Sequence, residues 1–158
     1  MRHNASSSFG DFKCTHCHAL VLSAHMLSGV NNRNHCPYCL WSRHLDLFAA
    51  GDRLSACKAA MKPIGLTMKL GRNKYRREAR GELMLIHQCT ECQALSINRI
   101  AADDDSAAIL AVFESSLESE IQRLCEGQGI VVLRASDSDV LYRQLYGGRV
   151  EVPLVAWS

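Results

Sequence analysis

Three pairs of cysteines, each with two residues between its members, restrict what this chain can fold into more than any other feature. The pairs are Cys14/Cys17, Cys36/Cys39 and Cys89/Cys92, and Cys57 stands alone between the second and the third. A CxxC turn holds two sulfurs close enough to bind one tetrahedral Zn²⁺. The first two pairs are separated by 18 residues, a spacing typical of zinc-binding CxxC–CxxC motifs. We therefore predict a zinc site formed by these four cysteines.

The other three of these cysteines predict a second zinc site. Cys57, Cys89 and Cys92 supply three thiolates, so we expect a histidine as the fourth ligand. We favour His44, which could reach across to the segment of Cys57, with His87 and His35 as alternatives. Two other arrangements stay open: Cys57 could be a small buried residue while two histidines complete the third pair, or Cys14/Cys17 and Cys89/Cys92 could form one zinc ribbon. The cofactor prediction is two Zn²⁺ per chain.

The segment around the second pair predicts a treble-clef-like geometry. Cys36 stands where a helix N-cap would be, Pro37 suits the first helical position, and the residues that follow have helical character. A second short helix is predicted over residues 51–62, with Asp52 as its N-cap. The segment from Lys62 to Cys89 reads as two strands around a basic loop. We predict an α+β fold with a small zinc-stabilised domain, treble-clef-like or zinc-ribbon-like, over residues 10–105.

Residues 106–158 predict a short acidic α+β extension. Helical spacing of apolar residues predicts a helix over 106–127, with Ser106 as a cap, and its apolar stripe contains Leu110, Phe113, Leu117, Ile121 and Leu124. A strand over 129–136, a short helix over 137–148 and a final strand over 149–157 complete this extension. Cys125 lies beside the stripe and is expected in the core. We expect the stripe to pack on the zinc domain, with a homodimer or a protein partner as the alternative.

Composition narrows the classes of protein that the chain can belong to. A hydrophobic content of 47% argues against a disordered protein. No apolar run approaches the roughly 18 residues of a membrane helix, and the start of the sequence lacks the apolar block of a signal peptide. We expect a cytoplasmic protein without membrane contact, in which eight cysteines indicate metal ligands rather than disulfides.

Several separate segments are similar to one known family. The segments are RNHCPYCLWSRHLD (33–46), GDRLSACKAAMKPIG (51–65), HQCTEC (87–92) and NRIAADD (98–104). Together they resemble the RNHCP domain family of small bacterial proteins, over roughly residues 10–105. The resemblance implies zinc binding and no particular activity. The positions it marks are Cys14, Cys17, Arg33, Asn34, His35, Cys36, Pro37, Cys39, His44, Asp46, Asp52, Arg53, Cys57, His87, Cys89, Cys92, Asn98, Arg99, Asp103 and Asp104. Gln93 stands where the family has a glycine, which is expected to loosen the third turn.

Charge is divided unevenly along the chain and gives the strongest indication of function. Residues 1–100 hold 14 Lys/Arg against 6 Asp/Glu, whereas residues 101–158 hold 4 against 10. Within the basic part, residues 62–82 contain seven Lys/Arg and two acids. Such a cluster neutralises phosphates, and a tyrosine within it can stack on a base. We predict non-catalytic binding of RNA, ribosomal RNA included, through Lys69, Arg72, Lys74, Tyr75, Arg76, Arg77 and Arg80.

Three other functions compete with RNA binding. A treble-clef metal-dependent nuclease could use His35, His44, Asp46 or the acidic run 103–105, although no HNH-like spacing is present. For the acidic run, the structural interpretation is a favourable entry to the following helix. For Asn98 and Arg99 it is hydrogen bonding to the turn. The cysteines could also form a thiol-based redox or zinc switch, and the extension could be a protein-interaction module.

Overall fold

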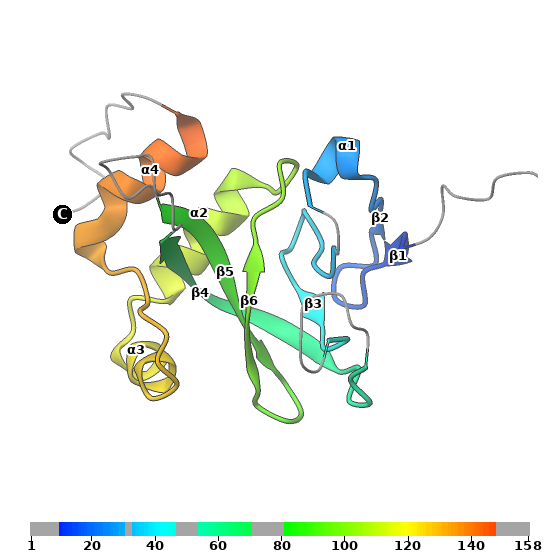
Figure 1. The fold of residues 1–158 in the computed structure, drawn as a ribbon, viewed down its shortest axis with the longest axis horizontal. Helices are drawn as coiled ribbons and strands as arrows, with labels where there is room; N and C mark the ends of the chain where they lie inside the picture. The colour runs from blue at the N-terminus through cyan, green and yellow to red at the C-terminus, as the bar shows by residue number, and fades with distance from the viewer. Residues whose placement is uncertain (1–9, 31–32, 47–53, 71–80, 148–158) are drawn as a thin grey trace, which may run out of the picture.

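The chain folds around a four-stranded antiparallel sheet (Figure 1). The computed structural model describes residues 10–30, 33–46, 54–70 and 81–147. Each strand of the sheet pairs with the next strand along the chain. The strands are β3 (Ser42–Arg43), β4 (Ala60–Leu70), β5 (Gly81–Cys89) and β6 (Leu95–Arg99).

The hairpin of β4 and β5 is the longest strand pair and determines where the functional segments lie. Its register runs from Met61 opposite Cys89 to Leu70 opposite Gly81. These strands confirm the prediction for the segment between Lys62 and Cys89. At a rise of about 3.3 Å per residue, the two ends of β4 are roughly 30 Å apart. Cys89 therefore lies at one end of the hairpin, and the segment 71–80, which is outside the described residues, connects its strands at the other end.

Two predicted helices of the zinc domain are wrong. Residues 37–39 form a turn instead of a helix, and the chain then enters β3. In the second predicted helix, residues 54–59 have no helical structure and β4 begins at Ala60, while Asp52 lies outside the described residues. The α+β class is confirmed, whereas the treble-clef helix after Cys36 is not found.

The N-terminal part of the domain is a small hairpin followed by one helical turn. Strands β1 (Phe12–Lys13) and β2 (Leu20–Val21) pair antiparallel, and the first CxxC turn connects them. Helix α1 (His25–Ser28) ends at Gly29, whose positive φ of 70° closes the turn in a conformation that glycine adopts without strain. This part lies beside the main sheet rather than within it (Figure 1).

The extension is helical over most of its described length. Helix α2 (Ser106–Ser115) is followed by α3 (Ser119–Glu126), so the single helix predicted over 106–127 is in fact two. The chain breaks at Ser116, whose buried hydroxyl donates to the carbonyl oxygen of Phe113. The N-cap of α2 is Asp105, which accepts from the amide of Ala107, and not Ser106.

The rest of the extension confirms one prediction and corrects another. A 3₁₀ turn (Ala135–Asp137) leads into helix α4 (Ser138–Tyr146), as predicted for 137–148. The strand predicted for 129–136 does not form. Leu133 donates one backbone hydrogen bond to Leu66 of β4, but no ladder follows. The strand predicted over 149–157 lies outside the described residues.

Helices cover both faces of the sheet, and each face has its own core cluster. On one face, α2 and α4 pack against the strands in a cluster of Leu40, Leu66, Leu83, Leu85, Ile109, Phe113, Leu133 and Leu141. On the other face, α3 and the segment before the 3₁₀ turn contribute to a cluster of Ile64, Ile86, Cys125 and Val132. The core prediction for Cys125 is therefore confirmed. Of the predicted stripe, Phe113 is fully buried, and Leu110, Leu117 and Ile121 pack partly buried against the two clusters, whereas Leu124 is 37% exposed.

Two candidate zinc centres and their supporting network

The first candidate zinc centre consists of the four cysteines of two CxxC turns. The sulfur of Cys14 lies 3.5 Å from that of Cys39, and the sulfur of Cys17 lies 3.5 Å from that of Cys36. All four sulfurs lie within 4.8 Å of one another. A tetrahedral Zn²⁺ with Zn–S bonds of about 2.3 Å sets its sulfurs about 3.8 Å apart, so the cluster fits one zinc ion. This grouping leaves the alternative ribbon of Cys14/Cys17 with Cys89/Cys92 without support.

The second candidate zinc centre combines three cysteines with His44. The sulfurs of Cys57 and Cys89 are 3.6 Å apart, and the sulfur of Cys92 lies 3.3 Å from Nδ1 of His44. These four ligand atoms also lie within 4.8 Å of one another. Three thiolates and one imidazole are an ordinary ligand set for structural zinc. Each of the two clusters could hold one zinc ion, which is consistent with two per chain.

Backbone pairing brings His44 and Cys57 together although neither lies on a helix. The amide of His44 donates to the carbonyl oxygen of Ala59 at 2.9 Å, and the amide of Lys58 donates back to His44 at 3.1 Å. These bonds continue the pairing of β3 with β4 past the end of β3. Lys58 has a positive φ of 49°, which turns the chain immediately after Cys57. The ligands are therefore placed by strand pairing.

The other two candidate histidines make hydrogen bonds elsewhere and belong to neither cluster. Nε2 of His35 lies 2.7 Å from a carboxylate oxygen of Asp104. Nε2 of His87 lies 2.7 Å from the carbonyl oxygen of Leu40. Among the described residues, the groups able to hold a metal ion are the two cysteine clusters alone, so Asp46 and the acidic run 103–105 form no further one. Ligation by His35 or His87 is therefore not supported, and His44 takes that place.

All three CxxC turns share one hydrogen-bond pattern. The amide of the first cysteine donates to the carbonyl five residues later, as in Cys14 to Ala19, and the amide four residues later donates back to the first cysteine. The residue at that fourth position has a φ of 65° in every turn, and it is His18, Leu40 and Gln93 respectively. This left-handed conformation is the one that glycine adopts freely and other residues adopt at a cost.

Local hydrogen bonds lower the pKa of one cysteine in each cluster. Burial raises the pKa of the Cys89 thiol, but the amides of Cys92 and Glu91 and the neighbouring Cys92 and His44 side chains outweigh it and bring the pKa to about 6. Burial opposes ionisation of Cys14 in the same way, and amide hydrogen bonds from Cys17 and His16 lower its pKa overall. Zinc binds the thiolate form, so these shifts favour the metal-binding species at Cys14 and Cys89. The pKa values of Cys36, Cys39 and Cys57 are raised, so binding of zinc would release their protons.

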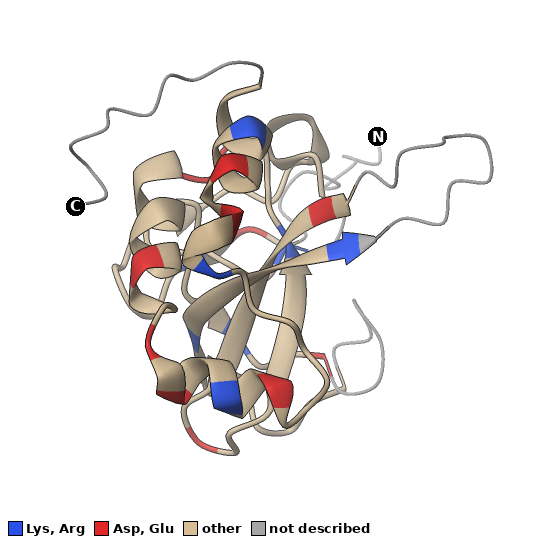
Figure 2. Ribbon diagram, turned by 90° about the vertical axis from the view of Figure 1, so that its left-hand side faces the viewer, with Lys and Arg blue, Asp and Glu red and all other residues tan. Residues whose placement is uncertain are grey.

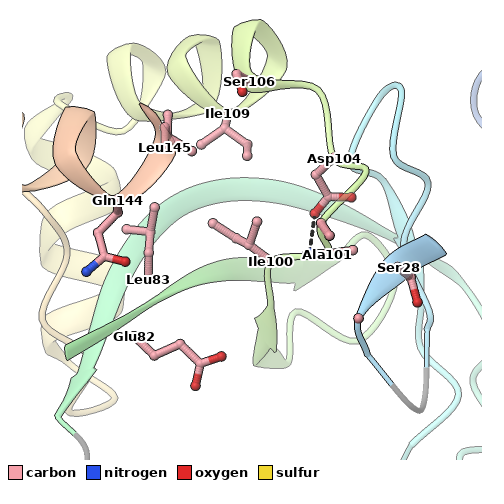
Figure 3. A pocket seen from close by; sticks show the side chains of 12 residues that line it. Ser28, Glu82, Leu83, Ile100, Ala101, Asp104, Ser106, Ile109, Gln144 and Leu145 are labelled. Carbon is pink, nitrogen blue, oxygen red and sulfur yellow. Dashed lines mark hydrogen bonds between the residues drawn. The ribbon is translucent and has the colours of Figure 1, made fainter. Parts of the chain in front are cut away.

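A buried polar network supports the segment before Cys36. The guanidinium of Arg33 is fully buried and contacts Asp103 at 2.8 Å and Asp104 at 3.2 Å, and its Nε donates to the carbonyl oxygen of His35. Asp104 also accepts from His35. It accepts from the backbone amide of Ala101 as well (Figure 3). Each buried charge therefore has a partner, which is the condition for burying it without a large loss of stability. The network joins residues 33–35 to the loop that precedes α2.

The residues of the acidic run 103–105, and the neighbours Asn98 and Arg99, have different structural roles. Asp105 caps α2, which confirms the structural interpretation for that residue, while Asp103 and Asp104 hold Arg33. The amide nitrogen of Asn98 lies 2.9 Å from Nδ1 of His87, and Arg99 pairs with Glu82 at the surface. Sequence reasoning missed the link from Arg33 to its carboxylates and the stacking of His16 on Trp41, with ring centroids 4.1 Å apart. For the link from Arg33, the only signal in the sequence was a pair of polar segments, residues 33–35 and 103–104, that lie far apart in the chain.

The family model described as "RNHCP domain" matches residues 9–110. The chain belongs to the RNHCP domain family. No curated protein and no solved structure matches it. The match spans both zinc centres, the β-sheet and the first part of α2, and it includes the pentapeptide of residues 33–37. In this member of the family, Arg33 and His35 anchor the segment to Asp104, Cys36 is a candidate ligand, and Pro37 begins the turn.

The residues predicted to bind nucleic acid lie mostly outside the described part of this RNHCP domain. Lys69, near the end of β4, is described and exposed. The others, which lie outside the described residues, are Arg72, Lys74, Tyr75, Arg76, Arg77 and Arg80. None of the helices that the structure describes is long and apolar enough to cross a membrane.

Proposed function

We propose that this protein is a zinc-stabilised RNA-binding module that holds RNA on the loop between β4 and β5 and does not cleave it. The observation that carries the proposal is the hairpin itself. Two paired strands, anchored at the second zinc centre, end in a segment of sequence with five Lys/Arg and one acid between residues 71 and 80. Clustered cations on one loop neutralise successive phosphates.

The distribution of charge over the described surface supports the hairpin end, rather than the helical side, as the place where RNA binds. Acidic residues lie along α2, α3 and α4 and their flanking turns, while the described end of the hairpin carries Lys69 on β4 opposite Glu82 on β5 (Figure 2). An acidic helical side repels a polyanion, and the five Lys/Arg between residues 71 and 80 attract it. RNA would therefore approach the molecule from the end of the hairpin.

The ligand sets support a structural role for the zinc ions. Both clusters offer four protein ligands, which leaves no open position for a substrate or an attacking water. The histidines that a nuclease would need are engaged, His44 with Cys92 and His35 with Asp104. These contacts favour binding without catalysis over the nuclease alternative.

The test compares two double variants with the same change in charge. Arg76→Glu/Arg77→Glu alters the loop, and Arg123→Glu/Arg143→Glu alters exposed positions on α3 and α4. We expect the loop variant to lose structured RNA, measured with a ribosomal RNA fragment, by at least tenfold in affinity, and the helical variant to retain it. Wild-type affinity should fall steeply with salt, because each neutralised phosphate releases counterions. Equal affinity of both variants, or an affinity independent of salt, would contradict the proposal.

Zinc content serves as the control for folding in this test. Residues 71–80 follow Leu70 in the chain, and Leu70 is at the other end of β4 from Met61, the partner of Cys89, so both variants should keep the zinc content of the wild type. RNA that is shortened during incubation with divalent cations, and left intact by a His35→Ala or His44→Ala variant that retains its fold, would indicate the nuclease alternative instead.

A further inference from the structure

The first candidate zinc centre carries a pair of stacked rings that are not zinc ligands. His16 lies inside the first CxxC turn and Trp41 follows the second, and their ring centroids are 4.1 Å apart with an angle of 6° between the ring planes. The four sulfurs of the two turns lie within 4.8 Å of one another. A zinc ion bound by both turns would therefore hold the two rings against each other.

The outer side of the His16 ring is accessible. Trp41 covers one face of the imidazole, yet His16 is exposed, so the accessible area lies on the opposite face and the edges of the ring. Within the described part of the chain, the His16 side chain forms no hydrogen bond or ion pair. Trp41 is only partly exposed and supports the imidazole from the inner side. The pair therefore presents a flat aromatic surface to which a further planar ring can be added.

Cations adjoin this aromatic pair, and no carboxylate lies opposite them in the sheet. Arg43 stands two residues after Trp41 on the edge strand β3, and its partner on β4 is Ala60. Lys62 stands two residues after Ala60, so it lies on the same face of the sheet as Arg43, and its partner on β5 is Gln88. Neither cation forms an ion pair with a residue that the structure describes. These cations offset the negative charge that thiolates leave around a zinc ion.

We propose that the outer face of His16 binds an unpaired base of the RNA by stacking, so that the base extends the pair of His16 and Trp41. Proteins bind single-stranded RNA by stacking its bases on aromatic side chains, histidine included, and every base has a face suited to this contact. A flat ring beside cations fits a base and its phosphate better than it fits the apolar side chain of a protein partner.

A second exposed ring lies at the same zinc centre. Tyr38 is the third residue of the second CxxC turn, as His16 is of the first, and it is 62% exposed. Both turns therefore place an aromatic side chain at the surface. This inference rests on the proposed function and adds a contact near the zinc-bearing end of β4, whereas the loop of residues 71–80 follows Leu70 at the other end of that strand.

The first experiment uses RNA that is too short to form a structured target. Hexaadenylate and hexauridylate are titrated separately into the zinc-loaded chain, and the carbon-bound ring protons of His16 are followed by NMR. A base stacked on the imidazole shields these protons, so we expect upfield shifts that are larger with adenine. The ring protons of His25, which is exposed on α1 outside the pair, should not move. If neither oligonucleotide shifts the His16 resonances, the proposal is wrong.

Three variants that keep every zinc ligand separate stacking from a structural role. His16→Ala should weaken the binding of hexaadenylate at least about fivefold, as expected for the loss of one stacked base. His16→Phe retains a flat ring and should bind about as well as the wild type. His25→Ala makes the alanine change at an exposed position outside the pair and should have no effect.

Zinc content is the control for folding in these variants, and all three should match the wild type. Equal binding of hexaadenylate by His16→Ala and His16→Phe would show that the ring pair serves the fold alone, and it would overturn the proposal. The NMR titration needs no variant, so it decides the question if His16→Ala loses zinc.

Salt separates this contact from the basic loop. Stacking neutralises no phosphate, so His16→Ala should weaken binding of the ribosomal RNA fragment by the same factor at low and high salt. Arg76→Glu/Arg77→Glu should instead flatten the salt dependence. If the loop variant loses the fragment while His16→Ala binds it with wild-type affinity, the proposed function stands and the stacking site is wrong. If the wild-type chain does not bind the fragment, the proposed function fails, and the titration with hexanucleotides alone decides on His16.

Discussion

Nε2 of His87 lies 2.7 Å from the carbonyl oxygen of Leu40, a hydrogen bond that joins β5 to the turn containing Cys36 and Cys39. A carbonyl only accepts, so Nε2 carries the proton and Nδ1 accepts from the amide of Asn98 at 2.9 Å. Burial, with a smaller contribution from His35, lowers the pKa of His87 to about 3, so the ring is neutral. Two residues later β5 reaches Cys89 of the second centre. One neutral histidine therefore links the supports of both zinc centres.

Replacing His87 should destabilise the protein without removing a zinc ligand. His87→Phe preserves ring volume but leaves the Leu40 carbonyl and the Asn98 amide without this partner, and each buried unsatisfied group costs about 1–3 kcal/mol. We expect a loss of about 2–4 kcal/mol in urea unfolding of the zinc-loaded chain, with zinc content unchanged. His25→Phe, at an exposed position on α1, is the matched control and should change little. A loss of zinc in His87→Phe would indicate that His87 is a ligand after all.

The two carboxylates that hold Arg33 should differ sharply in their contribution to stability. The side chain of Asp104 is fully buried and also accepts from His35 and Ala101, whereas that of Asp103 is 34% exposed. Asp104→Asn leaves a buried guanidinium undercompensated, and we expect it to cost about 3–5 kcal/mol. Asp103→Asn changes a partly solvated pair and should cost about 1 kcal/mol or less. Similar losses in thermal unfolding of the two variants would contradict this division.

The zinc ligands could be predicted from the sequence because their chemistry is local. A CxxC spacing brings two sulfurs together whatever the rest of the chain does, and counting thiolates then requires a fourth ligand for Cys57, Cys89 and Cys92. The hairpin of β4 and β5 and the helices of the extension also follow from local patterns of apolar residues. These are the parts of the fold that the structure confirms.

The helix predicted after Cys36 was wrong because long-range pairing determines that segment. A cysteine followed by proline looks like a helix start, but Leu40 adopts a φ of 65° and Ser42 pairs with Met61 of β4. The network around Arg33 was missed for a related reason. Its partners are 70 and 71 residues away in the chain. Arginine and aspartate are also residue types that usually lie on the surface, so the sequence gives no sign that they are buried here. Patterns within a short window carry no information about such contacts.

The third CxxC turn can be stabilised at the position where the family has a glycine. Gln93 is exposed and has a φ of 65°, which costs a non-glycine residue about 1–2 kcal/mol, partly offset by the extra freedom of glycine in the unfolded chain. We expect Gln93→Gly to raise the free energy of unfolding by about 0.5–1 kcal/mol. Leu40→Gly makes the same change in the second turn but removes a fully buried side chain, and it should cost about 2–5 kcal/mol. A destabilised Gln93→Gly would show that the exposed hydrogen bonds of the Gln93 side chain with Gln88 and Thr90 outweigh the strain.

The two zinc centres should release their metal at different rates. In the first centre Cys17 is the one exposed cysteine, and Cys14 and Cys36 are 3% and 0% exposed, whereas in the second both Cys57 and Cys92 are exposed and Cys89 is buried. A chelator in solution reaches exposed thiolates first, so we expect two phases of zinc release, of equal size, measured with a colorimetric chelator.

Substitution of single cysteines assigns these phases. Cys57→Ser should leave close to one zinc per chain by elemental analysis and abolish the fast phase, because the remaining four-cysteine cluster is intact. Cys36→Ser should unfold the N-terminal part of the domain, since a structural zinc contributes on the order of 10 kcal/mol to a fold of this size. Cys125→Ala removes a cysteine that lies in the core and in neither cluster, and it should keep both ions and both phases. A single phase in the wild type, or a fast phase that persists in Cys57→Ser, would show that exposure does not determine the order in which the ions leave.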